Sequence, residues 1–109
     1  MSTPKKNLVA VRDLLSDPKR WTKNAVARNS AGQVTEVLGS SATCFCLMGA
    51  IQRVTDLDYR MEVDAATLIY AEQIRRNNEG VGITLFNDNA FTTHKDVINL
   101  LDAAIANAP

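Results

Sequence analysis

Apolar positions recur at the spacing of an α-helix near the start of the chain. They are Leu8, Val11, Leu14 and Leu15. Thr3 is expected to be the N-cap of this helix, with Pro4 at the first helical position, where its missing N–H costs nothing. Asp17-Pro18 should end the helix, because the residue before a proline is displaced from helical dihedral angles.

Three later segments are also predicted to be helices. Residues 42–54 are apolar on almost every side, which is typical of a helix in the middle of a domain. Gly49 lies inside this segment and costs about 1 kcal/mol relative to alanine, so we expect another backbone to approach closely there. The third helix is predicted over residues 63–77 with Asp64 as its cap. The fourth begins at Thr93-x-x-Asp96, a pattern similar to a capping box.

Two regions are predicted to be extended. Residues 25–27 and 33–37 flank an Asn-Ser-Ala-Gly turn and should form a hairpin. Val81, Ile83 and Leu85 alternate with other residues as in a short strand, which should pair with this hairpin. The fold class is therefore predicted to be α+β, with about four helices packed on a small, mainly antiparallel sheet made of the hairpin plus one strand.

The composition is that of a globular protein, since 46% of the 109 residues are hydrophobic and 22% are charged. This length corresponds to a single domain, residues 1–109. Twelve basic and twelve acidic side chains cancel, and tight nucleic-acid binding needs many basic contacts with phosphates. Nucleic acid is therefore a disfavoured partner. We expect no membrane association, because no apolar run approaches ~20 residues and no signal peptide is evident.

Cys44 and Cys46 are one residue apart, too close to join distant parts of the chain by a disulfide. Free cysteines are typical of a reducing compartment, so we expect a cytoplasmic protein.

One histidine and these two cysteines fall short of the four ligands of a structural zinc ion. There is also no glycine-rich phosphate loop. The sequence predicts neither a metal site nor a cofactor.

One group of residues has catalytic potential: Cys46 as a nucleophile, His94 as its base, and Asn87 or Asp88 to orient the imidazole. The plainer interpretation of each is structural. Cys46 lies in the most apolar segment, and free cysteine is among the most buried residue types. His94 in a first helical turn is commonly solvated, and Asn87 and Asp88 are ordinary turn formers. We favour the structural interpretation.

The tryptophan offers a candidate binding region. Trp21 is the sole tryptophan and follows Lys19-Arg20. It is predicted either to cover the edge of the core or, with Arg20 and Arg28, to anchor a partner, because Trp and Arg are enriched at interface hot spots.

Charged residues of the third helix are expected to be solvated, while its Leu68, Ile69 and Ile74 face inward. The charged residues are Glu72, Arg75, Arg76 and Glu79.

The order of these motifs resembles a family of small, uncharacterised domains of bacteria and their phages. The matching segments are Arg20-Trp21, residues 25–28 with Gly32, the Cys-x-x-Gly-Ala of residues 46–50, Asn87-Asp88, and the Asp-x-Ala-Ile of residues 102–105. Phe45 departs from the pattern, which has tryptophan before the cysteine. The resemblance implies a bacterial or phage setting and carries no known activity.

The leading hypothesis is a non-enzymatic binding module of phage or mobile-element type, in the form of an inhibitor of a bacterial defence or regulatory protein. Its partner would be a protein or a small ligand in a bacterial cell, and the expected contact residues are Arg20, Trp21, Arg28, Asn87 and Asp88. The first alternative is a cysteine-dependent hydrolase or transferase that uses Cys46 and His94. The second is a structural accessory protein that forms a homo-oligomer.

Overall fold

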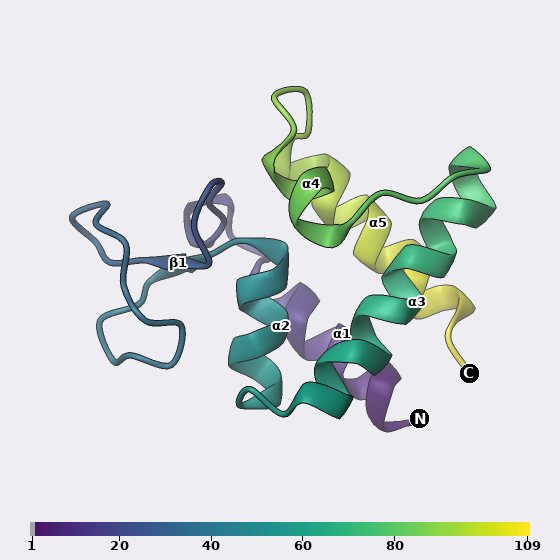
Figure 1. The fold of residues 1–109 in the computed structure, drawn as a ribbon, viewed down its shortest axis with the longest axis horizontal. Helices are drawn as coiled ribbons and strands as arrows, with labels where there is room; N and C mark the ends of the chain where they lie inside the picture. Colours follow the sequence, from purple (N-terminus) through teal and green to yellow (C-terminus); the bar gives the residue numbers. More distant parts are fainter. Residues whose placement is uncertain (1) are drawn as a thin grey trace.

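The computed structural model describes residues 2–109, which form an α+β fold dominated by helices (Figure 1). In chain order the elements are α1 (Thr3–Leu14), the 3-10 helix η1 (Pro18–Arg20), β1 (Ala27–Arg28), β2 (Cys44–Phe45), α2 (Leu47–Thr55), α3 (Tyr59–Asn77), α4 (Ile83–Asp88) and α5 (His94–Asn107). Among the described residues, no helix is long and apolar enough to cross a membrane.

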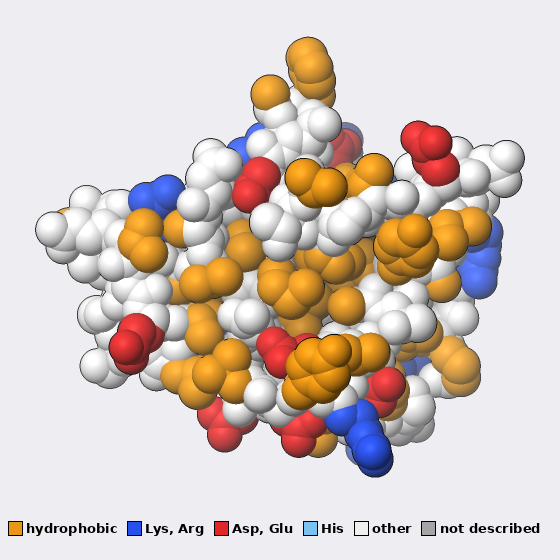
Figure 2. All heavy atoms as spheres, viewed as in Figure 1, with side chains coloured by type: hydrophobic (Ala, Val, Ile, Leu, Met, Phe, Trp, Pro, Cys, Tyr) orange, Lys and Arg blue, Asp and Glu red, His pale blue; other side chains and the backbone are white. Residues whose placement is uncertain are grey.

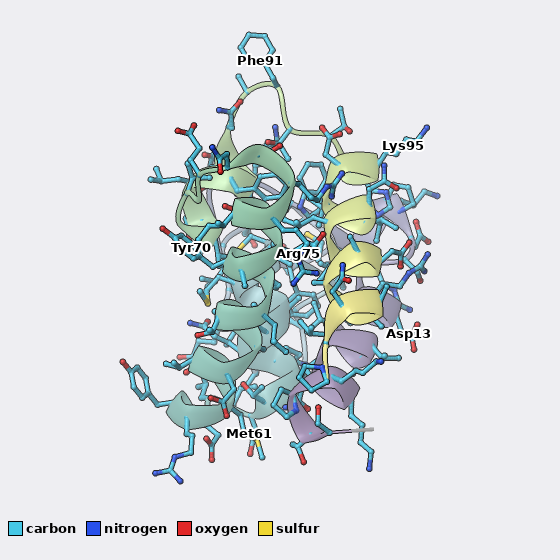
Figure 3. The ribbon with its side chains drawn as sticks, turned by 90° about the vertical axis from the view of Figure 1, so that its right-hand side faces the viewer. Asp13, Met61, Tyr70, Arg75, Phe91 and Lys95 are labelled. Atoms are coloured by element: carbon cyan, nitrogen blue, oxygen red, sulfur yellow. The ribbon has the colours of Figure 1, made fainter. Side chains whose placement is uncertain are left out.

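The core lies where the four longer helices meet. α1 packs against α2, α3 and α5, and α3 packs along α5, as Figure 3 shows from the side. Each of these helices contributes fully buried aliphatic side chains: Leu8, Val11, Ile51, Ile69, Val97 and Leu101. The sheet and its loops extend from one side of this helical body (Figure 1).

Side-chain caps fix where the helices begin. The predicted capping box of α5 is confirmed, because Thr93 Oγ1 accepts from the Asp96 N–H and the Asp96 carboxylate accepts from the Thr93 N–H. Two other predicted caps are wrong. Ser2, not Thr3, caps α1, and Asp58, not Asp64, caps α3 by accepting from the Met61 N–H at 3.0 Å. α3 is therefore one turn longer than predicted.

The predicted strand at residues 81–86 is wrong, because Ile83–Asp88 form the short helix α4. Ile83 and Asn87 are buried and Phe86 is half-buried, while Leu85 is 73% exposed. Inward positions at 83, 86 and 87 follow the period of a helix, not the alternation of a strand. The alternation of Val81, Ile83 and Leu85 therefore does not correspond to alternating burial.

The sheet consists of β1 and β2, which pair antiparallel with Ala27 opposite Phe45. The predicted hairpin is wrong in its second strand, since residues 33–37 form no strand and are paired only by one antiparallel bridge, from Arg28 to Val34. The predicted helix over residues 42–54 is wrong in its first part, because residues 44 and 45 form β2 and α2 begins at Leu47.

The prediction of a close backbone approach at Gly49 is confirmed. A Cβ atom at this position would lie 1.9 Å from the carbonyl oxygen of Val26. That carbonyl precedes β1 and accepts a hydrogen bond from the Cys46 N–H at 3.3 Å. Glycine at this position therefore lets α2 pack directly on the chain that leads into the sheet.

Candidate functional site

A buried polar cluster joins α4 to the start of α2 and to the segment after η1. At its centre is Asn87, whose side chain is fully buried. Its Oδ1 accepts from Trp21 Nε1 at 2.6 Å and from the Leu47 N–H at 3.0 Å. Its Nδ2 donates to the Thr22 carbonyl at 3.1 Å and to Asp88 Oδ1 at 2.9 Å. Asn87 therefore satisfies the first N–H of α2 and fixes the indole ring, both from inside the protein.

Three of the five residues predicted to contact a partner meet in this cluster: Trp21, Asn87 and Asp88. Trp21 is half-buried, and Asp88 also accepts from the Asn24 N–H at 2.9 Å. Arg28 lies on β1, where its guanidinium donates to neighbouring loop oxygens. Arg20 is exposed at the end of η1 and lines a separate hollow. The contact of these residues with a partner stays a prediction, and Asn87 acts inside the fold.

The thiol of Cys46 caps α2. Its Sγ accepts a hydrogen bond from the Gly49 N–H at 3.2 Å, and the residue is 2% exposed. His94 begins α5, and its Nε2 lies 2.6 Å from the Leu15 carbonyl oxygen, so this nitrogen must carry a hydrogen. Among the described residues no hydrogen bond joins the thiol to the imidazole. The ring lies instead beside Trp21, with 6.0 Å between their centroids.

Burial raises the pKa of the Cys46 thiol above its ordinary value, against the lowering effect of hydrogen bonds from the Gly49 and Met48 N–H groups. The nearby carboxylate of Asp88 raises the same pKa further. A reactive cysteine needs the opposite environment, one that stabilises the thiolate. At neutral pH the Cys46 thiol is therefore protonated and serves as a buried helix cap.

This raised pKa predicts that stability falls as the pH rises above about 8.5, where a thiol in the unfolded chain ionises. In that range the folded state holds more protons than the unfolded state, so a rise in pH favours unfolding. Cys46→Ser keeps a capping side chain and removes the titration. We expect wild type to lose stability relative to Cys46→Ser between pH 8 and 10, measured by urea unfolding. Parallel stability curves for wild type and Cys46→Ser would contradict the assignment.

A second feature is an apolar face on the solvent side of α3, which sequence reasoning missed. We define this outer face as Tyr59, Val63, Ala66, Tyr70 and Ile74, which lie four, three, four and four residues apart. Tyr59 is 79% exposed, and Ile74, predicted to face inward, is 45% exposed. Tyr70 points to the side of α3 away from α5 (Figure 3).

A different side of α3 carries the fully buried residues. Ala65 and Ile69 are fully buried there. The prediction that Glu72 is solvated is wrong, because it is 4% exposed and accepts from Arg75 at 3.3 Å and from Asn107 at 3.1 Å. α3 therefore has apolar residues on two faces, of which one is used by the core.

Two hollows lie near the outer face: one shares Tyr59, Val63 and Ala66 with it, and the other is at α4, which packs against α3. One, of about 360 Å³, lies between α2 and α3 and is lined by Met48, Gln52, Tyr59, Glu62, Val63 and Ala66. The other, of about 340 Å³, lies beside α4 and is lined by Val81, Leu85, Phe86, Asp88, Asn89 and Thr92. Figure 2 shows hydrophobic side chains gathered across this face of the molecule, over α2, α3 and α4. Phe91 projects beyond it from the tip of the loop between α4 and α5 (Figure 3).

Within residues 2–109, no group of three His, Cys, Asp or Glu side chains is placed to hold a metal ion. Fold and site together define a small, mainly helical α+β domain with a structural polar cluster and an exposed apolar face. The model of a family of unknown function, DUF6197, matches residues 1–107, and the chain belongs to this family. No curated protein and no solved structure was found to match the chain.

Proposed function

We propose that this chain is a non-enzymatic protein-binding module and that the outer face of α3 receives its partner. The observation that carries the proposal is the exposure of Tyr59, Val63, Tyr70 and Ile74 along a helix that already contributes other side chains to the core. Contiguous apolar patches on soluble domains commonly mark interaction sites. The raised pKa and the burial of Cys46 argue against the cysteine-enzyme alternative.

The chemistry of the partner follows from the charges beside the apolar face. The charged residues that line its two hollows are Glu62 and Asp88, and both are acidic. A groove of this kind suits an amphipathic helix, whose apolar side enters the groove while its flanking residues meet the rim. We infer that the partner segment is such a helix, with Lys or Arg on its flanks to complement the carboxylates.

The proposal also covers the identity of the partner and the biological context of the chain. We propose that the partner is a bacterial defence or regulatory protein, inhibited when this chain covers one of its helices, and that the chain is of phage or mobile-element type. The resemblance to small bacterial and phage domains supports this setting. Two free cysteines support a location in the reducing cytoplasm.

The test is a calorimetric titration with a designed helical peptide that has leucines along one side and lysines on both flanks. We expect saturable binding with a dissociation constant of about 10 µM or lower. Tyr59→Glu and Leu85→Glu should each weaken it at least about tenfold, because each places a charge in the contact. Both side chains are largely exposed, at 79% and 73%, so the variants should fold normally.

Ala71→Glu is the matched control, because it adds the same charge at an exposed position of α3 outside the outer face. It should bind like wild type, and a peptide with glutamates in place of its lysines should bind at least about tenfold more weakly. Equal binding by all three variants would refute the proposed site. A mass that doubles with concentration in sedimentation, and that Leu85→Glu returns to a monomer, would assign the face to a second copy of the chain instead.

A further inference from the structure

A hollow of about 300 Å³ lies on the side of the fold where η1, β2 and α2 come together. Its lining residues are Leu14, Arg20, Ala42, Thr43, Phe45 and Arg53. The two charged side chains among them are both arginines, and no Asp or Glu lines the hollow. Its lining therefore carries two positive charges and no carboxylate.

Arg53 is held in place on the wall of this hollow. Its Nη1 donates to the Val37 carbonyl at 2.9 Å and to the Gly39 carbonyl at 3.0 Å, and its guanidinium lies 5.6 Å from the centre of the Phe45 ring. These contacts use one of its three nitrogens. The remaining N–H donors of Arg53 have no hydrogen-bond partner within residues 2–109, which leaves them available to a ligand.

Arg20 supplies the second charge from the end of η1. It is exposed, and no side-chain hydrogen bond or ion pair engages it in the part of the chain that the structure describes. The short helix η1 fixes its backbone, because Asp17 caps η1 by accepting from the Lys19 N–H at 2.9 Å. The side chain can therefore close over a ligand bound at Arg53 without breaking an existing contact.

We propose that this hollow binds a phosphate monoester carried on a compact apolar group. A phosphate monoester has a charge of about −1.5 to −2 at pH 7, which two guanidinium groups match, and its oxygens accept paired N–H donors from arginine. Leu14, Ala42 and Phe45 form an apolar wall for the group that carries the phosphate. The volume lies at the lower end of the range of small-molecule sites, about 300–1,000 Å³. This inference is independent of the proposed protein-binding face.

The experiment uses phenyl phosphate as the probe, followed by calorimetry and by ¹⁵N NMR at low salt. We expect saturable binding, with shifted amide signals for Thr43, Phe45 and Arg53, and much weaker binding of the monoanion benzoate. Arg20→Gln should weaken the binding of phenyl phosphate about tenfold, as expected for the loss of one charged hydrogen-bonding group. Arg76→Gln is the matched control, since Arg76 is exposed on α3 and lines no part of this hollow.

Three results would overturn the inference. One is the absence of saturation up to about 10 mM phenyl phosphate. Another is equal weakening by Arg20→Gln and Arg76→Gln, which would mean that net charge alone matters. The third is equally tight binding of benzyl alcohol, a neutral compound of similar size. None of these three results bears on the peptide titration at the outer face, so the two proposals fail or succeed separately.

Discussion

Replacing Gly49 with alanine is expected to destabilise the fold by about 3 kcal/mol, the upper end of the cost of overpacking a core. The added Cβ would lie 1.9 Å from the Val26 carbonyl oxygen and 2.8 Å from its carbonyl carbon. Neither atom can rotate away, because both belong to the backbone. Relief requires a shift of α2 or of the chain before β1, which would strain the Cys46 N–H to Val26 hydrogen bond. The gain in helix propensity, about 1 kcal/mol, is too small to compensate.

The measurement is thermal or urea unfolding followed by the fluorescence of Trp21, the sole tryptophan. A loss of 3 kcal/mol should lower the melting temperature on the order of 15 °C in a domain of this size. Gly82→Ala is the control, because a Cβ there would meet nothing within 4 Å. It should cost less than about 1 kcal/mol, the usual price of losing glycine at a helix N-cap. Equal stability of the two variants would show that α2 and Val26 do not pack as described.

Replacing Asn87 with alanine is expected to cost about 4 kcal/mol. The substitution leaves two donors without their acceptor: the buried backbone N–H of Leu47 and the partly buried indole N–H of Trp21. Each unsatisfied buried donor costs about 1–3 kcal/mol, and the cavity adds to this. Asn99→Ala is the control, since Asn99 is exposed on α5, and its stability should remain within about 0.5 kcal/mol of wild type.

A double-mutant cycle separates the indole contact from the helix cap. Trp21→Phe removes the donor at 2.6 Å and leaves Asn87 bound to Leu47. We expect a coupling energy of about 1–2 kcal/mol between Trp21→Phe and Asn87→Ala. Because Trp21→Phe removes the fluorophore, the four proteins are compared by circular dichroism. Strictly additive effects would mean that the two side chains do not share a hydrogen bond.

The sequence predicted those parts of the fold that depend on local chemistry. Thr93 and Asp96 identified the start of α5 because a capping box is complete within four residues. Gly49 identified a close backbone contact because a glycine inside a buried helix has a cost that something must offset. Both inferences needed no knowledge of distant parts of the chain.

The sheet could not be predicted in this way, because its pairing is not local. β1 pairs with β2. In the sequence, the residues of β2 belong to the same apolar run as Gly49, and such a run favours a helix. Val81, Ile83 and Leu85 have the alternation of a strand, but a strand needs a partner, and residues 81–86 have none in the two-stranded sheet. In α4, tertiary packing of Ile83 and Asn87 therefore overrides the local pattern.

The outer face of α3 is not evident from the sequence, because the predicted third helix begins several residues too late. With a predicted start at residue 63, Tyr59 lies in a loop, and Ile74 is predicted to face inward, so the stripe from Tyr59 to Ile74 is not recognised. Recognition of Asp58 as the cap would have revealed two apolar faces on one helix, of which a small domain needs one for its core. The burial of Asn87 could not be predicted from the sequence, because an asparagine after apolar residues is equally typical of an exposed turn.

The most direct test of the account is the ¹H–¹⁵N spectrum of the protein with the lysine-flanked peptide, because one spectrum reports both candidate surfaces. The amides of α3 report the outer face, and the single indole N–H signal reports Trp21 and its bond to Asn87. We predict that the amides of Tyr59, Val63 and Tyr70 shift while the indole signal stays in place. A shifted indole with an unchanged α3 would contradict the account and place the binding surface at Trp21.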